Sequence, residues 1–236
     1  MWGGDFYFPE TKSNIRHEVI RNIGNLITYV KGDYELAQKW YDSSGEYHEC
    51  FMYPSNLYKE YDITQEKYTT TNIQLGNSAD PTNNHIEVLK KLEKYKNEDI
   101  KIFAPLSYGD QVYAQDVIKK GKKLFGDKFI PLTEFMPFEK YLEFLGKIDI
   151  AIFAHKRQQA MGNIITLLGL GKKVYIRNDI TPWELFKDIN VKVFNIQDFK
   201  IDLIDEQIKK ANQQKIREYF SKENYLNQLK NLFESK

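Results

Sequence analysis

The sequence predicts an α/β protein in which residues 69–200 form a parallel sheet with helices on both faces. Between residues 70 and 195, short apolar segments typical of buried strands alternate with segments of helical periodicity, and the connections are short. Hydrophobic residues make up 42% of the chain and charged residues 28%, as in a soluble globular protein with a core. Right-handed crossovers then put the ligand crevice at the carboxyl ends of the strands.

Six strands and five helices are expected in this part. The strands are residues 70–75, 101–105, 129–132, 149–153, 173–176 and 192–194. The helices are residues 85–96, 111–125, 137–145, 163–170 and 182–187. Asn83 or Asn84 is expected to cap the first helix, and Gly171 is a typical stop for the fourth.

The segment before the sheet is less regular. Residues 1–14 are expected to form a loop, because glycines and a proline interrupt any periodic pattern. Asn14 is a suitable cap for a following helix, although residues 27–30 alternatively form a strand.

Further along, the pattern becomes weaker and then helical again at the end of the chain. Asp33 is expected to cap a helix at residues 34–41, and a short strand is expected at 49–53. Residues 55–68 have the polar composition of a linker. The tail, residues 205–233, has an amphipathic helical pattern.

Composition excludes several classes of function. The formal net charge is +1, from 34 Lys and Arg against 33 Asp and Glu, so a dedicated nucleic-acid binder is not expected. Cys50 is the only cysteine and the four histidines are scattered, which predicts a reduced, cytoplasmic protein without a metal site or a cofactor. No apolar run approaches the roughly 20 residues of a membrane span, so membrane contact is expected to be peripheral.

The first candidate loop follows the first strand of the sheet. Gly76 permits a tight turn and a close approach of the backbone to a ligand. Asn77 and Ser78 offer small hydrogen-bonding groups beside it. By spacing alone an ordinary strand-to-helix turn is the preferred interpretation, since the pattern is neither a dinucleotide nor a P-loop motif.

The second candidate loop, residues 155–163, joins the strand 149–153 to a helix. Its polar and flexible positions are Arg157, Gln158, Gln159, Gly162 and Asn163, next to Lys156. A cationic loop that leads into a helix N-terminus suits a pyrophosphate, because the first N–H groups of the helix are free and its dipole favours anions. A polar surface loop with Asn163 as the helix cap explains the same residues equally well.

Three further positions follow other strands. Arg177 would face the same crevice, where it would bind a phosphate or form a structural ion pair with Glu184. Tyr108 follows the second strand, and Thr133 and Glu134 follow the third. Each of them is more often structural than functional.

Taken in order, these loops resemble a known family. Residues 73–196 resemble the carboxyl-terminal domain of the bacterial TDP-4-acetamido-4,6-dideoxygalactose (TDP-Fuc4NAc) transferases, glycosyltransferase family 56. The matching pieces are Leu75-Gly76-Asn77-Ser78, Asn84-His85-Ile86, Ala104-Pro105-Leu106-Ser107-Tyr108-Gly109, Phe138–Leu145, the Arg157-Gln158-Gln159 segment within Phe153–Gly162, Arg177-Asn178 with Pro182-Trp183, Trp2-Gly3-Gly4-Asp5 and Asn224-Tyr225-Leu226. In the arginine piece, the order of Arg and Asn is reversed relative to the family.

The resemblance implies a GT-B architecture, in which two Rossmann-like domains face each other across a cleft. Residues 69–200 would be the nucleotide-sugar-binding domain, and residues 1–68 a remnant of the acceptor domain with its linker. Residues 201–236 would be a helical tail that packs back on the N-terminal part. The chain therefore looks shortened, lacking most of the acceptor half.

The resemblance also implies an activity. The chain would transfer a deoxyamino sugar from a TDP-sugar to a polyprenyl-diphosphate-linked saccharide, as in enterobacterial common antigen assembly at the inner face of the plasma membrane. No metal would be needed, and no nucleic acid would be bound. Arg157 and its loop would bind the diphosphate, with Arg177 behind. Asp5 is the candidate base.

The remaining donor residues are assigned in the same way. Gly76, Asn77 and Ser78 would approach the sugar or the diphosphate. Tyr108 would face the donor, and Thr133 or Glu134 the thymine or ribose. Two alternatives remain open: a non-catalytic nucleotide-sugar-binding fragment, and a nucleotide-sugar epimerase of the same architecture.

Overall fold

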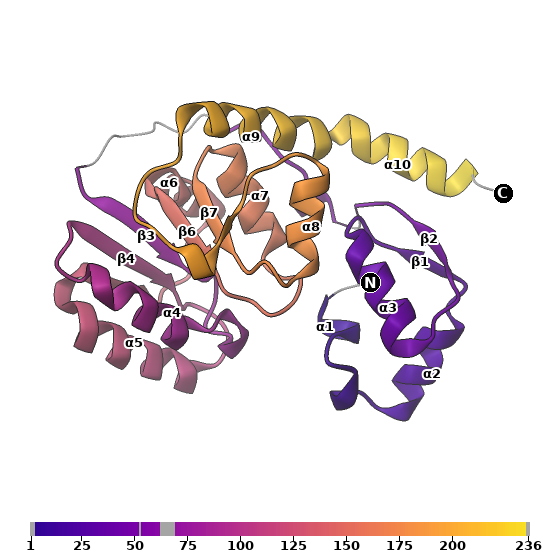
Figure 1. Cartoon of the computed structure of the whole chain (residues 1–236), viewed down its shortest axis with the longest axis horizontal. Helices are drawn as coiled ribbons and strands as arrows, with labels where there is room; N and C mark the ends of the chain where they lie inside the picture. Colours follow the sequence, from indigo (N-terminus) through magenta and orange to yellow (C-terminus); the bar gives the residue numbers. More distant parts are fainter. Residues whose placement is uncertain (1–2, 52, 62–68, 235–236) are drawn as a thin grey trace.

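The computed structural model describes residues 3–51, 53–61 and 69–234 (Figure 1). The second half of the expected linker, residues 62–68, lies outside the described residues, as does Trp2 of the N-terminal motif. Among the described residues, no helix is both long enough and apolar enough to cross a bilayer.

The larger part of the chain is built on a six-stranded parallel sheet. Its strands are β3 (Thr71–Leu75), β4 (Ile100–Pro105), β5 (Phe129–Leu132), β6 (Ile150–Phe153), β7 (Lys173–Ile176) and β8 (Phe194–Asn195). Their order in the sheet is β5-β4-β3-β6-β7-β8, and every pairing is parallel. Successive strands are added on one side of β3 as far as β5, and then on its other side from β6 to β8. Open α/β sheets bind ligands at the point where the strand order reverses in this way, here between β3 and β6. The parallel α/β fold predicted from the sequence is therefore confirmed.

Helices cover both faces because the buried strands are apolar on both sides. On one face lie α4 (His85–Leu92) and α5 (Gln111–Phe125). On the other lie α6 (Phe138–Lys147), α7 (Met161–Gly169), α8 (Thr181–Asp188) and α9 (Glu206–Tyr219). Strand β6 shows the division, since Ile150 and Ile152 belong to the first core whereas Ala151 and Phe153 belong to the second.

The N-terminal part, residues 3–51, forms a small lobe beside the larger part (Figure 1). Its elements are α1 (Gly3–Phe6), a 3-10 turn at Pro9–Thr11, α2 (Asn14–Asn22), β1 (Asn25–Ile27), α3 (Lys31–Tyr41) and β2 (Glu46–His48). Strands β1 and β2 pair in parallel, and α3 packs against α8 of the larger part.

The structure corrects several local expectations in this part. Residues 3–11 contain α1 and the 3-10 turn instead of a continuous loop. The second strand is Glu46–His48, not residues 49–53. Asp33 does not cap α3: the cap position is Val30, and Asp33 lies buried within the first turn. A local pattern identifies Asp as a cap, but the burial of Asp33 depends on contacts with distant residues.

The C-terminal tail is two helices and not one. Helix α9 ends at Tyr219 and packs on α7, and α10 (Lys222–Glu234) continues over the N-terminal part (Figure 1). Gln228 on α10 accepts a hydrogen bond from the backbone N–H of Phe51 at 3.0 Å and donates one to Glu49 at 3.1 Å. The tail thus connects both parts of the chain.

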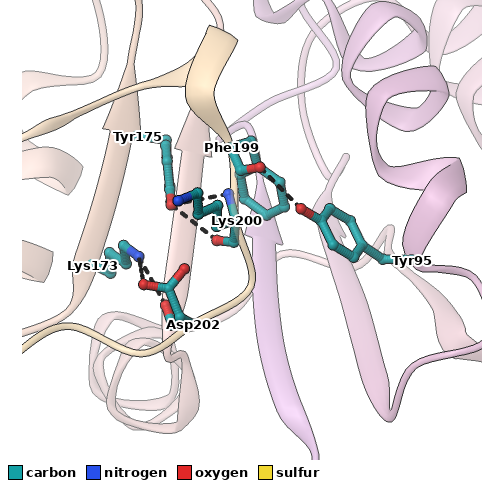
Figure 2. Close-up of polar contacts among 6 residues, drawn as sticks. All are labelled: Tyr95, Lys173, Tyr175, Phe199, Lys200 and Asp202. Carbon is teal, nitrogen blue, oxygen red and sulfur yellow. Dashed lines mark hydrogen bonds and ion pairs between the residues drawn. The ribbon is translucent and has the colours of Figure 1, made fainter.

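A strap, residues 199–202, leads from the last strand to α9 and is fixed to the amino-terminal side of the sheet (Figure 2). The Tyr175 hydroxyl donates to the carbonyl of Lys200 at 2.9 Å, and Lys173 Nζ lies 3.0 Å from a carboxylate oxygen of Asp202. Tyr95 donates to the carbonyl of Phe199 at 3.0 Å. Strand β8 begins at Phe194, so the expected strand at residues 192–194 was placed too early.

Candidate functional site

The loop after β3 lies at the switch point and is shaped by a glycine. Gly76 has φ +67°, in the left-handed region. A Cβ added there would lie 2.6 Å from His85 Nε2 and 2.7 Å from Asn83 Oδ1. These contacts are too short for any side chain, so the turn requires glycine and leaves its backbone open to close approach.

Asn83, which is fully buried, holds this turn in place. Its Oδ1 accepts from the backbone N–H of Asn77 at 3.0 Å and contacts His155 Nε2 at 2.9 Å, while its Nδ2 donates to Ser78 Oγ at 3.2 Å. Because a backbone N–H can only donate, the oxygen of Asn83 is the acceptor, and His155 must carry its proton on Nε2. Burial, with a smaller contribution from the charge of Arg157, lowers the pKa of His155 to about 3, so this histidine is neutral.

His85 lies behind the same turn. Both of its ring nitrogens are buried without a hydrogen-bond partner among the described residues. Burial lowers its pKa to about 4, so it too is neutral. The sequence pattern indicated Asn83 only as a cap and pointed to no role for His85 or His155. The spacing gives no sign that these three side chains meet.

Residues of the loop after β6 contact two different parts of the molecule, the loop after β3 and the N-terminal part. Gln159 accepts a hydrogen bond from Thr82 at 2.9 Å, which joins this loop to the one after β3. Arg157 is half-buried and donates to the carbonyl of Gln158 at 3.2 Å. Although burial opposes it, hydrogen bonds from Thr82 and the charge of Arg157 lower the pKa of Asp80. The charge of Arg157, on the loop after β6, therefore acts on a carboxylate of the loop after β3.

Gln158 points the other way, toward the N-terminal part. Its side chain hydrogen-bonds the hydroxyl of Tyr29, and its backbone hydrogen-bonds the hydroxyl of Tyr7. Gln158 thus connects the loop after β6 to the N-terminal part.

The N-terminus of α7 faces the crevice without a side-chain cap. The cap position is Ala160, at φ 58°, and no side chain hydrogen-bonds the first turn there. Asn163 lies inside the helix and accepts from the Tyr141 hydroxyl, so the alternative in which Asn163 caps this helix is wrong. Gly162, in the first turn, carries no side chain that would cover these N–H groups.

An aromatic hollow of 240 Å³ opens at the ends of β3, β4 and β5. It is lined by Asn77, Pro105, Ser107, Tyr108, Leu132, Phe135, Met136, Phe138, Tyr141 and Asn163. Phe135, Phe138 and Tyr108 are 83%, 56% and 55% exposed, and the Tyr108 hydroxyl accepts from Asn77 at 3.1 Å. Exposed aromatic side chains gathered around one hollow indicate a binding surface.

Thr133 and Glu134 are exposed and precede Phe135 without lining the hollow. Phe135 and Phe138 were missed as site residues. The signal was an aromatic pair directly after a strand.

A second, larger hollow of 960 Å³ lies between the N-terminal part and α8, and we call it the junction hollow. Tyr7, Gly32, Lys156, Asn178 and Thr181 are among its lining residues. It therefore borders the loop after β6.

Two expected site residues, Arg177 and Asp5, line neither hollow. Arg177 binds Asp179 with two hydrogen bonds of 2.8 and 2.6 Å, so its ion pair is with Asp179 and not with Glu184. Asp5 is exposed on α1, where its carbonyl accepts from Arg16 at 3.3 Å, and it lines neither hollow. Within the described ranges, no three His, Cys, Asp or Glu side chains gather as a metal site would require.

Solved structures of glycosyltransferases have a fold similar to that of this chain. WaaG, a glycosyltransferase involved in lipopolysaccharide biosynthesis, is 13% identical with a TM-score of 0.59, covering 90% of this chain and 63% of WaaG. A glycosyltransferase from Rickettsia africae ESF-5 is also 13% identical, with a TM-score of 0.70 and coverage of 94% and 67%. A point mutant of S. aureus TarM, solved with fondaparinux, α-GlcNAc-glycerol and UDP, is 14% identical with a TM-score of 0.69 and coverage of 99% and 49%.

These neighbours are GT-B glycosyltransferases, and this chain has the same fold. It spans about two thirds of their length or less. The family described as 4-alpha-L-fucosyltransferase, glycosyl transferase group 56, matches residues 1–235. The chain belongs to that family.

Proposed function

We propose that this chain is a glycosyltransferase that binds a TDP-sugar at the carboxyl edge of its six-stranded sheet. The sugar would be a deoxyamino sugar like Fuc4NAc, transferred to a polyprenyl-diphosphate-linked saccharide. The observation that carries the proposal is the meeting of the Gly76 turn, the Arg157 loop and the aromatic hollow at the switch point. Family membership supports sugar transfer, and the UDP in the TarM complex supports a nucleotide donor.

We place the donor along this edge with its nucleoside in the aromatic hollow. The thymine and ribose occupy the aromatic hollow against Tyr108, with Thr133 and Glu134 at its rim. Asn163 on α7 also lines this hollow, so the diphosphate that follows the ribose meets the free N–H groups of that helix. Arg157 supplies a positive charge, and the open backbone at Gly76 admits the diphosphate or the sugar. Asn77, Ser78, Gln159 and Gly162 shape the walls, while Gln158 and Arg177 act from behind.

Transfer requires stabilisation of the departing diphosphate. We assign that role to the guanidinium of Arg157 and to the N-terminal amides of α7, which act without a metal. The Asn83 network fixes the neighbouring Gly76 turn, so the backbone beside the diphosphate is also preorganised.

The same proposal divides the chain. Residues 1–68 belong to the acceptor side, residues 69–200 hold the donor, and residues 201–236 join the two. A lipid-linked acceptor places the reaction at the inner face of the plasma membrane, in the assembly of a surface polysaccharide such as enterobacterial common antigen. Asp5 remains a candidate base, and a second candidate borders the junction hollow.

Calorimetric titration with TDP tests the donor site. We expect Arg157→Ala to weaken TDP binding by about tenfold or more, because a hydrogen-bonded charge is lost from the diphosphate. Arg217→Ala is the matched control, since Arg217, on the tail helix α9, forms an exposed ion pair with Glu60. Equal TDP affinity in the wild type and in Arg157→Ala removes Arg157 from the site, and no binding of TDP, UDP or GDP removes the site itself.

A transfer assay with TDP-Fuc4NAc and a polyprenyl-diphosphate-linked disaccharide tests the activity. Binding of TDP with transfer supports the proposal. Binding without transfer identifies the chain as a nucleotide-sugar-binding module, and conversion of the donor sugar without an acceptor identifies an epimerase.

A further inference from the structure

A buried carboxylate lies where the two parts of the chain meet. Asp33, in the first turn of α3, is fully buried and belongs to none of the ion pairs among the described residues. The other charged groups of that turn, Lys31 and Glu35, are exposed and pair with each other at 3.9 Å. On α8, the nearby acid Glu184 is exposed and pairs with Lys187. Within the described ranges Asp33 therefore lacks an ion-pair partner, although a buried carboxylate is costly without one.

Two hydroxyl groups surround its Oδ1. The Tyr7 hydroxyl lies 2.7 Å away and Thr181 Oγ1 lies 2.5 Å away, and the two hydroxyl oxygens are themselves 2.8 Å apart. Three oxygens thus form a triangle whose three sides are all of hydrogen-bond length. Tyr7, Asp33 and Thr181 come from three different segments, and we call them the junction triad.

Counting protons shows what this triangle lacks. With Asp33 ionised, Tyr7 and Thr181 supply two protons for three oxygen–oxygen contacts, so one contact holds none. A third proton, on Asp33 Oδ1, completes a ring in which each oxygen donates once and accepts once. The geometry therefore favours uptake of one proton. Burial acts in the same direction, since it raises the pKa of Asp33 to about 6 against the opposing hydrogen bonds from Thr181 and Tyr7.

The triad also borders the junction hollow, next to the loop after β6. Tyr7 and Thr181 both line the junction hollow, and Thr181 is only half-buried. The Tyr7 hydroxyl is hydrogen-bonded by the backbone of Gln158, in the loop beside Arg157. The triad is thus tied directly to a loop that we assign to the donor. Asp5, by contrast, lies outside this hollow.

We propose that the junction triad accepts the proton of the acceptor hydroxyl during sugar transfer, with Thr181 as the group in contact with the acceptor. The inference rests on the proposed function. As the acceptor oxygen bonds to the anomeric carbon, the bond from that carbon to the diphosphate breaks and its electrons leave with TDP. The acceptor proton passes to Thr181 Oγ1, and the proton of Thr181 passes to Asp33 Oδ1. Asp33 acts through Thr181 and is in this sense a positioning residue.

The packing around Thr181 offers a matched pair of variants. A Cβ placed on Gly32 would lie 2.8 Å from the Thr181 methyl group, so the methyl group fills the space at that glycine. Thr181→Val keeps this shape and removes the hydroxyl. Thr181→Ser keeps the hydroxyl and removes the methyl group. A role in proton transfer predicts that valine is far worse than serine, whereas a packing role predicts the reverse.

The experiment is a transfer assay from pH 4.5 to 9 with TDP-Fuc4NAc and the lipid-linked disaccharide, with TDP affinity measured in parallel. For the wild type, kcat/KM should fall about tenfold per pH unit below about 6. Asp33→Asn should lower kcat about 100-fold or more, abolish this pH dependence and leave TDP affinity unchanged. Thr181→Val should be at least tenfold slower than Thr181→Ser. Asp42→Asn, at the other end of α3, is the control.

The outcomes separate the two proposals. If the wild type transfers sugar and Asp33→Asn stays within threefold of it, or if Thr181→Val equals Thr181→Ser, the triad is overturned and the transferase function stands. A wild-type chain that binds TDP but transfers nothing overturns the role of the triad and the transfer step, and leaves the donor site. A wild-type chain that binds no nucleotide overturns the donor site as well.

Discussion

Single residues decide how the loops at the carboxyl edge are held. Gly76 and Asn83 act together, because the glycine leaves room for the Asn83 oxygen and that oxygen in turn binds the N–H after the glycine. The glycine was recognisable in the sequence as a turn residue. Its partner was not, because an asparagine before a helix most often serves as a cap. Asp33 was expected to be a cap for the same reason, and only the tertiary contacts with Tyr7 and Thr181 show its burial.

Gly76→Ala should disrupt the donor edge. The new Cβ would lie against His85 and Asn83, in addition to the strain of a left-handed alanine, so we expect a loss of roughly 2–4 kcal/mol in unfolding free energy. TDP affinity should fall with it. Gly126→Ala is the control, because its φ is +56° but nothing lies within 4 Å of the added Cβ. Denaturant titration of both variants measures the difference, and an equal loss in the two would show that the contacts at Gly76 are unimportant.

Asp33 should make stability depend on pH. Its pKa is about 6 in the folded protein, against 3.8 for an unperturbed carboxyl group. The folded state therefore holds the proton more tightly, and this contribution to stability is present below pH 4 and lost as the pH rises through about 6. The difference amounts to roughly 3 kcal/mol at most. Relative to Asp33→Asn, the wild type should be more stable at pH 4 than at pH 7.5 by about that amount in urea titrations. A constant difference across this range would refute the raised pKa.

Helices and strands were predictable where capping and turn residues mark both of their ends. Helix α5 was expected at residues 111–125 and is found at Gln111–Phe125, because Asp110 caps it and Gly126 follows it. Strands β5 and β7 likewise match, since each is apolar and lies between turn residues. The N-terminal part was predicted less well, because β1 and β2 are three residues each and too short to show a period.

Helix α10 is expected to stabilise the N-terminal part through Gln228. Gln228→Ala would leave the buried N–H of Phe51 without its acceptor, which we expect to cost about 1–3 kcal/mol of unfolding free energy. Gln214→Ala on α9 is the matched control, since Gln214 is exposed and bonds only to Glu218 among the described residues. If thermal denaturation shows the same midpoint for both variants, α10 does not hold the N-terminal part in this way.

At the scale of the whole molecule, the order of the strands explains where the chemistry gathers. The first strand of the sheet, β3, lies at its centre, and the helices that follow β3 and β6 pack on opposite faces, so the loops after these two strands meet at the carboxyl edge. The alternation of strands and helices predicted this edge and the loops that form it. It did not predict the aromatic hollow or the junction hollow, because each is lined by side chains from segments far apart in the sequence.

Hydrogen–deuterium exchange with and without TDP tests the central claim most directly. A donor nucleotide at the carboxyl edge should slow exchange in four segments, residues 76–84, 107–110, 133–138 and 155–163, and leave the strap at residues 199–202 unchanged. Protection confined to other segments, or no protection at saturating TDP, would contradict the donor site proposed for this protein.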